Sequence, residues 1–236
     1  MAKLCVFGDS IMKGVIYDGA KKKYSLLKDS FANSVSKIFS FSTDNFAKFG
    51  CTVTKGLEIA QKHVSDIENS DYVALEFGGN DSDFNWEDIS DKPDAMHHPK
   101  TTIKEYENNY MDLISTVKSA GGQPLVLNLP PLDAQKYFNW ISKGLNKENI
   151  LKWLGGSEEY IYRWHEMYNM SLCKLTNKTN VPLIDIRSIF LEKHDYKSYF
   201  CIDGIHPNEQ GHALIVQAIE DFAVEHDIPI DNISFN

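Results

Sequence analysis

Short apolar runs alternate with longer amphipathic segments along this chain. The apolar runs are bounded by glycine, proline or polar residues, which is typical of buried strands. Strands are therefore expected at residues 3–8, 44–49, 71–77, 123–129 and 181–186. Between these runs, apolar residues recur at the spacing of one helix face. Helices are expected at residues 24–39, 53–67, 102–119 and 213–226.

This alternation predicts the fold class. Strands that alternate with helices favour a parallel sheet that is covered by helices on both faces. The chain has 236 residues and shows no linker, internal repeat or low-complexity tract, so a single domain over residues 1–236 is expected. The predicted architecture is a three-layer α/β/α sandwich around a central, mostly parallel sheet of the flavodoxin-like kind.

Two segments depart from the alternation. Residues 83–100 are expected to form a long loop. Residues 131–165 are too long for a simple connection and too aromatic for a disordered one, so they predict a helical insertion near a site. The aromatic rings of this region either fill the core or form a wall over a substrate pocket, and Trp86 of the long loop could join them. These rings belong to Tyr137, Phe138, Trp140, Trp153, Tyr160, Tyr162, Trp164 and Tyr168.

The net charge narrows the range of partners. The formal net charge is −9, which argues against nucleic acid and anionic membranes, because both require a basic patch. No apolar run approaches the length of a membrane span, and the N-terminus lacks the apolar core of a secretory signal. A cytoplasmic location is therefore expected, and the sequence indicates no oligomeric state.

Cysteine and histidine spacing gives no sign of a metal site. The four cysteines are widely separated, so reduced thiols are expected. His97 and His98 are adjacent but have no third ligand at a suitable spacing, which favours a solvated or rim position over metal binding. His212 is expected to cap or to pack. Four other histidines belong to no motif: His63, His165, His194 and His226.

Polar residues and glycines stand at the ends of three expected strands. Asp9 and Ser10 follow the first strand, Gly50 follows the second, and Asn80 follows the third within the sequence GGND. The carboxyl ends of parallel strands lie at one edge of a sheet, where ligands bind in such folds. Each segment alone fits a turn or a helix cap. Together they indicate a site.

A fourth polar segment, FCIDGIHPNEQGH, precedes the last expected helix. It places Asp203 three residues before His206. Pro207 suits the first position of a helix, so a polar helix entry is one explanation of this segment. A catalytic base with its orienting acid is the other explanation.

The four segments resemble the sequence blocks of the SGNH hydrolases, also called GDSL-type esterases and lipases. The blocks match Ser10 in FGDSI, Gly50 in NFAKFGCTVTKG, Asn80 in FGGND and His206 in DGIHP. They span nearly the whole chain, although Ile11 stands where the family name has leucine and Gly56 is a weaker candidate in the second block. The resemblance implies the α/β/α fold and esterase, lipase, thioesterase or carbohydrate deacetylase activity on a small-molecule ester substrate. No cofactor or metal is expected, because the chain lacks metal-ligand spacing and a dinucleotide fingerprint.

The chemistry expected of these residues follows from their side chains. Ser10 is a weak nucleophile unless His206 takes its proton, and Asp203 would fix the imidazole tautomer and stabilise the imidazolium. The backbone N–H groups of Ser10 and Gly50 and the side-chain amide of Asn80 would form an oxyanion hole. The predicted site is therefore a Ser10–His206–Asp203 triad with three oxyanion donors.

The expected function is a serine esterase that acts through an acyl-enzyme intermediate. The aromatic insertion and the lack of a membrane-binding face favour short acyl groups on a soluble substrate, with carbohydrate as one candidate. A long-chain lipase, a thioesterase of the same family and a non-catalytic binding module remain alternatives. A Rossmann-like nucleotide binder is excluded, because FGDSIMKG lacks the G-x-G-x-x-G pattern.

Overall fold

The computed structural model describes residues 2–228 and contains a five-stranded parallel sheet, as the sequence predicted. In spatial order its strands are β4 (Ser42–Asn45), β1 (Lys3–Gly8), β5 (Tyr72–Glu76), β6 (Pro124–Leu127) and β7 (Leu183–Ile184). A separate antiparallel hairpin pairs β2 (Val15–Asp18) with β3 (Lys23–Leu26).

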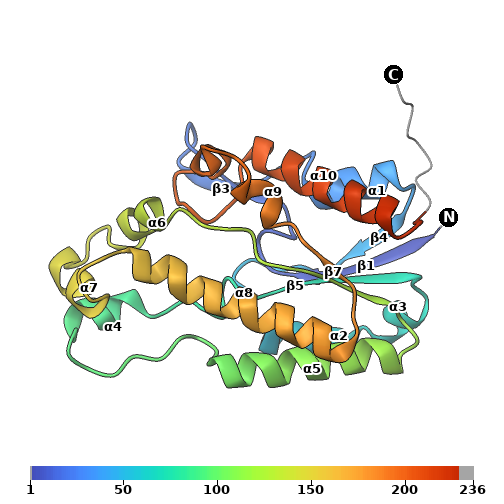
Figure 1. Ribbon diagram of the computed structural model, residues 1–236, viewed down its shortest axis with the longest axis horizontal. Coiled ribbons are helices and arrows are strands. Elements are labelled where there is room, and N and C mark those ends of the chain that lie inside the picture. Colours follow the sequence, from blue (N-terminus) through green and yellow to red (C-terminus); the bar gives the residue numbers. More distant parts are fainter. Residues whose placement is uncertain (1, 229–236) are drawn as a thin grey trace.

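Helices cover both faces of the sheet (Figure 1). One layer contains α1 (Phe31–Ile38), α9 (Ser188–Leu191) and α10 (Glu209–Glu225). The other contains α2 (Val53–Lys62), α3 (Val64–Glu68), α5 (Ile103–Ser119) and α8 (Glu159–Thr179). A short 3₁₀-helix, η1 (Tyr196–Tyr199), precedes α10. The three-layer α/β/α fold class is therefore confirmed.

Alternation along β1 explains why the sheet has a core on each side. Leu4 and Val6 pack in the cluster that includes residues of α1 and α10. Cys5 and Phe7 pack in the cluster that includes residues of α2, α5 and α8. Successive side chains of a strand point to opposite faces, so one short apolar run supplies both cores.

The strand order fixes where a site is expected. The chain passes from β1 to β4 on one side and later to β5, β6 and β7 on the other. The order therefore reverses between β1 and β5, and ligands bind at such a switch point in open α/β sheets. Asp9 and Ser10 follow β1, and Asn80 follows β5.

The segment 131–165 is helical and lies at one end of the molecule. It contains α6 (Ala134–Ile141), α7 (Lys147–Trp153) and the start of α8. Figure 1 shows α7 beside α4 (Trp86–Asp91) and α6 above α7, at the end opposite the N-terminus. That these residues form an insertion within a single domain stays a prediction.

The largest difference from the sequence prediction lies in residues 24–30. A helix was expected from residue 24, but β3 occupies Lys23–Leu26 and α1 begins at Phe31, after the cap residue Ser30. Leu26 is 63% exposed, so it does not belong to the apolar face that its spacing suggested. Cross-strand pairing of Tyr17 with Tyr24 favours the hairpin, since aromatic pairs stabilise adjacent strands.

Other element boundaries also differ. The second strand is Ser42–Asn45 rather than 44–49, and the helix expected at 53–67 is broken at His63 into α2 and α3. The expected long loop 83–100 contains α4, because Asn85 caps this helix by accepting a hydrogen bond from the Asp88 amide. The last helix begins at Glu209, earlier than expected, and β6 and β7 are shorter than their apolar runs.

Within residues 2–228, none of the helices combines the length and apolar character needed to cross a membrane.

Candidate active site

Three side chains distant in the sequence form a hydrogen-bonded chain at the carboxyl edge of the sheet. The Ser10 Oγ lies 2.8 Å from His206 Nε2, and His206 Nδ1 lies 2.7 Å from Asp203 Oδ2. Ser10 is in the turn after β1, while Asp203 and His206 are in the loop before α10. The structure thus brings together the three residues predicted as a triad.

The Asp203 carboxylate is buried, and both of its oxygens accept hydrogen bonds. Its Oδ1 accepts hydrogen bonds from the backbone N–H groups of Ile205 and His206, each at 3.2 Å. Burial alone would raise the pKa of the Asp203 carboxyl, but the hydrogen bonds and charge of His206 outweigh it and the pKa is lowered. Asp203 is therefore ionised at neutral pH and can orient the imidazole.

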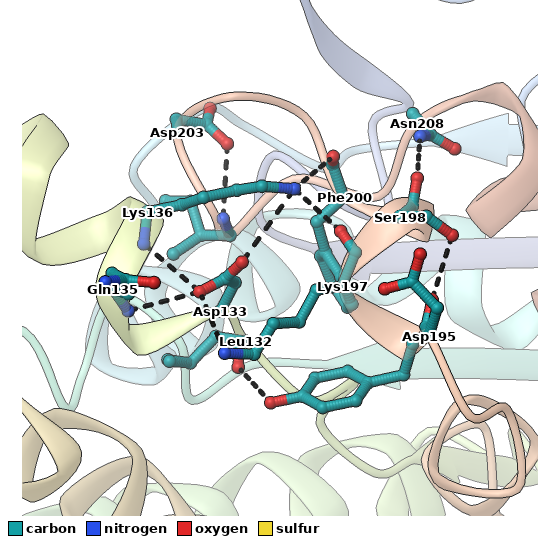
Figure 2. A network of polar contacts seen from close by, with 12 residues as sticks. Leu132, Asp133, Gln135, Lys136, Asp195, Lys197, Ser198, Phe200, Asp203 and Asn208 are labelled. Carbon is teal, nitrogen blue, oxygen red and sulfur yellow. Dashed lines mark hydrogen bonds and ion pairs between the residues drawn. The ribbon is translucent and has the colours of Figure 1, made fainter.

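The loop that carries Asp203 is attached to the start of α6 (Figure 2). The Lys136 Nζ donates to the carbonyl of Lys197 at 2.7 Å and to that of Phe200 at 3.4 Å. The Asp133 amide donates to the Gly204 carbonyl at 2.8 Å. Gly204 has φ +79°, and a Cβ there would stand 2.6 Å from the Asp133 carbonyl oxygen. Close approach of α6 therefore requires glycine between the acid and the base.

The three residues that carry the predicted oxyanion donors, Ser10, Gly50 and Asn80, border one cavity. Gly50 has φ +69°, and a Cβ at this glycine would lie 4.0 Å from Asn80 Oδ1. Among residues 2–228, the backbone N–H groups of Ser10 and Gly50 donate to no other group. Gly56, the weaker candidate, lies within α2 against the Phe77 ring. Of the two candidate glycines, only Gly50 borders the cavity.

Asp9 orients the Asn80 side chain. The Asn80 Nδ2 donates to Asp9 Oδ2 at 2.9 Å, while Asp9 Oδ1 accepts from the Ile11 amide at 2.8 Å. Because a carboxylate only accepts, this contact fixes which end of the amide faces Asp9. The second Nδ2 hydrogen stays available for a ligand. Asp9, to which the sequence assigned no catalytic role, is therefore a positioning residue for Asn80.

Further buried carboxyl groups support this region. Glu76 is fully buried and is paired with Gly8, the residue before Asp9. Burial, and then the charge of Asp9, raise the pKa of Glu76 well above its ordinary value, which favours the neutral form of this carboxyl group. Asp81 accepts from the Val53 amide with both oxygens at 3.1 Å. Burial raises the pKa of Asp81 to about 7, and its contact with Val53 ties the Asn80 loop to α2.

Aromatic rings line the cavity, which has a volume of about 290 Å³. From the 131–165 region they are Tyr137, Trp140, Tyr160 and Trp164, and from elsewhere they are Tyr24, Phe49, Phe84 and Trp86. Most of these rings also pack in a single apolar cluster of α4, α6, α7 and α8. The aromatic region is therefore both core and pocket wall, and Trp86 joins it as predicted.

Two of these rings cover the imidazole. The Tyr24 ring centroid lies 5.2 Å from that of His206, and the Phe49 ring is stacked on His206 at 6.0 Å. Sequence reasoning missed both rings, because Tyr24 was placed in a helix and Phe49 was the last residue of an expected strand. It also missed Asp83 and His165, which line the cavity but belong to no motif.

The remaining histidines have no metal partner in the described part of the chain. Residues 2–228 hold no group of three histidine, cysteine or acidic side chains arranged for a metal ion. His97 Nε2 lies 2.8 Å from the Lys92 carbonyl oxygen. His212 is buried and its Nδ1 accepts from the Phe31 amide at 3.3 Å, so it packs and caps as expected.

Comparison with known proteins agrees with the fold and the motifs. The chain matches the model of the GDSL-like Lipase/Acylhydrolase family over residues 6–214. A search of curated proteins finds no match.

Similar solved structures include a lipase/acylhydrolase from Enterococcus faecalis, at 18% identity and a TM-score of 0.65, which covers 96% of this chain and 97% of that chain. LAE5, an alpha/beta hydrolase from the metagenome of Lake Arreo in Spain, has 19% identity, coverage of 96% and 95%, and a TM-score of 0.67. A catalytic mutant of Axe2, an acetylxylan esterase from Geobacillus stearothermophilus, has 17% identity, coverage of 93% of each chain and a TM-score of 0.62. At these identities the likeness concerns the fold. The family match over most of the chain shows that this protein belongs to the GDSL-like lipase/acylhydrolase family, and it is a hydrolase that acts on ester bonds.

Proposed function

We propose that the protein is a serine esterase that hydrolyses short acyl esters of a soluble substrate, with acylated carbohydrates as the first class to examine. The observation that carries this proposal is the hydrogen-bonded chain from Ser10 through His206 to Asp203, with distances of 2.8 Å and 2.7 Å. A binding module would gain nothing from this chain, whereas a serine nucleophile requires it.

The first half of the reaction forms an acyl-enzyme. The Ser10 Oγ attacks the ester carbonyl carbon while His206 Nε2 takes the hydroxyl proton, and Asp203 stabilises the imidazolium. The carbonyl oxygen becomes an oxyanion, which the Ser10 and Gly50 amides and the Asn80 side chain bind. His206 then gives its proton to the departing alcohol as the C–O bond breaks.

The second half returns the enzyme to its starting state. His206 takes a proton from water, and the resulting hydroxide attacks the acyl carbon. The same three donors bind the second oxyanion, and Ser10 leaves with the proton from His206. Each step uses only side chains and amides of this chain together with water, so no cofactor enters the proposed mechanism.

The size of the cavity supports short acyl groups. Its volume of about 290 Å³ is near the lower end of the roughly 300–1,000 Å³ of small-molecule sites. Bulky rings from α6 and α8 occupy the surrounding space. Acetyl or butyryl esters would leave room for the alcohol part of the substrate, whereas a palmitoyl chain would have to extend beyond the wall.

We expect kcat/KM to fall as the acyl chain lengthens, because the aromatic wall limits the acyl space. The measurement is steady-state hydrolysis of p-nitrophenyl esters from acetyl to palmitoyl, beside acetate release from acetylated sugars. Higher kcat/KM for palmitoyl than for acetyl or butyryl esters would favour a long-chain lipase. Turnover of acyl thioesters above that of all oxygen esters would favour a thioesterase, and no turnover of any substrate would favour a binding module.

Asn80→Ala is expected to lower kcat by about 10²–10³ with little change in KM, because the lost hydrogen bond forms mainly in the transition state. The measurement is steady-state hydrolysis of p-nitrophenyl acetate, with circular dichroism to confirm folding. Asn109→Ala is the control, since the Asn109 amide bonds Thr54 on the exposed surface. A rise in KM at unchanged kcat would mean that Asn80 binds the ground state instead.

A further inference from the structure

One polar side chain on the cavity side of α8 has no partner. The Trp164 Nε1 donates to the Ser82 carbonyl at 3.1 Å, and the Asn169 Oδ1 accepts from the Leu129 amide at 3.2 Å. The Tyr168 hydroxyl donates to the Thr101 carbonyl at 2.5 Å. Between them, the His165 side chain makes no hydrogen bond within residues 2–228: its Nδ1 is fully buried without a partner, and its Nε2 is unpaired but not fully buried, so Nε2 is the nitrogen that a ligand could reach.

His165 belongs to the wall of the cavity that holds Ser10. It is 6% exposed and lines the cavity beside Ile161 and Trp164 of the same helix. The residues at positions i, i+3 and i+4 share one helix face, so all three are directed to the same space. His165 is thus a polar group in an otherwise mainly apolar part of the wall.

The imidazole of His165 is neutral. Burial, and then the nearby Arg187 charge, lower its pKa to about 3. A neutral imidazole carries one donor and one acceptor. It can therefore bond a hydroxyl group in either direction, but it offers no charge for an anionic substrate.

An unpartnered buried imidazole costs stability unless something bonds it. A site built to bond a substrate hydroxyl discriminates strongly against an analogue that lacks it, because the buried polar group is then left without a partner. We propose that His165 is a specificity-determining residue that hydrogen-bonds a hydroxyl group of the ester substrate. This inference rests on the proposed esterase function and names a substrate class for the same cavity.

The hydroxyl could belong to the alcohol part or to the acyl part of the ester, so the test needs two sets of substrates. The first compares monoacetates of straight-chain diols with two to six carbons against the matching alkyl acetates. The second compares p-nitrophenyl 3-hydroxybutyrate and 4-hydroxybutyrate with p-nitrophenyl butyrate. The quantity measured is the ratio of kcat/KM for the hydroxylated ester to that for its unsubstituted partner.

In the wild-type protein we expect this ratio to exceed that of His165→Leu by about 10-fold, the size of one net hydrogen bond, for at least one hydroxyl position. His165→Gln, which keeps a donor and an acceptor, should retain part of the preference. Because each ratio is taken on one preparation, a partly unfolded variant does not alter it. His194→Leu is the matched control, since His194 is exposed and does not line the cavity. The ratio of this variant should equal that of the wild type.

Binding to a Ser10→Ala variant separates this inference from the proposed function. Calorimetric titration should show tighter binding of the preferred hydroxylated ester than of its unsubstituted partner, and the Ser10→Ala/His165→Leu double variant should lose the difference. This measurement needs no turnover, so it holds even if the wild-type protein hydrolyses none of the esters. Equal ratios in wild type and His165→Leu, or equal binding of both esters to Ser10→Ala, would overturn the role of His165.

Discussion

His206→Ala is expected to lower kcat for p-nitrophenyl acetate by several orders of magnitude, on the order of the 10⁶ seen when a serine protease loses its base. His206 Nε2 lies 2.8 Å from the Ser10 Oγ, and within residues 2–228 no other titratable group is hydrogen-bonded to that hydroxyl. Without the imidazole, Ser10 stays protonated and acylation nearly stops. The measurement is steady-state kinetics, with circular dichroism to confirm folding.

The double variant Ser10→Ala/His206→Ala should lower kcat only a little more than either single change does. The nucleophile and its base act as a unit, so removing one abolishes the contribution of the other. His194→Ala provides a control for the loss of a histidine at an exposed position. Labelling with a fluorophosphonate should place the adduct on Ser10 of the wild-type protein and should be strongly slowed in His206→Ala. Near-normal turnover by a folded His206→Ala variant would contradict the triad and would mean that DGIHP is only a polar helix entry.

Local signals explain why the sequence predicted the main parts of the site. The segments GDS, GGND and DGIHP each place their polar residues within a few positions of a strand end or a helix start. Their convergence then follows from the parallel order of β1 and β5, which the apolar runs at 3–8 and 71–77 had indicated. The arrangement of the site could therefore be anticipated from short patterns and one rule of sheet topology.

Features that depend on tertiary contact could not be found in this way. Residues 24–39 have helical spacing, yet Tyr24 pairs with Tyr17 in a hairpin and covers His206. His165 appeared as one histidine among several without a motif, and only the missing partner within the folded chain distinguishes it. Asp9 shows its contact with Asn80 only once β1 and β5 lie side by side. The Asp9–Asn80 contact joins residues 71 positions apart in the chain, which is beyond the range of local patterns.

Asp203→Asn should lower kcat by about 10⁴, as the corresponding change does in a serine protease. Asparagine keeps the size of the side chain and can still accept from the Ile205 and His206 amides, which donate to Asp203 Oδ1 at 3.2 Å. Its Nδ2 would then face His206 Nδ1, which is 2.7 Å from Asp203 Oδ2 in the wild type. Because that amide group donates, the imidazole must present an acceptor at Nδ1 and carry its proton on Nε2, where it cannot accept the Ser10 proton.

This variant should therefore differ in kind from His206→Ala. The imidazole remains in place and the base is present in the wrong tautomer, so the loss in kcat should be smaller than that of His206→Ala while KM changes little. The measurement is steady-state hydrolysis of p-nitrophenyl acetate by folded protein, with Asp221→Asn, an exposed position on α10, as the matched control. The lowered pKa of Asp203 means that the wild-type residue is a carboxylate at neutral pH, so the comparison is between a charged acceptor and a neutral amide. If Asp203→Asn stays within about ten-fold of the wild type, the buried carboxylate neither sets the tautomer nor stabilises the imidazolium, and its hydrogen bonds would serve only to hold the loop.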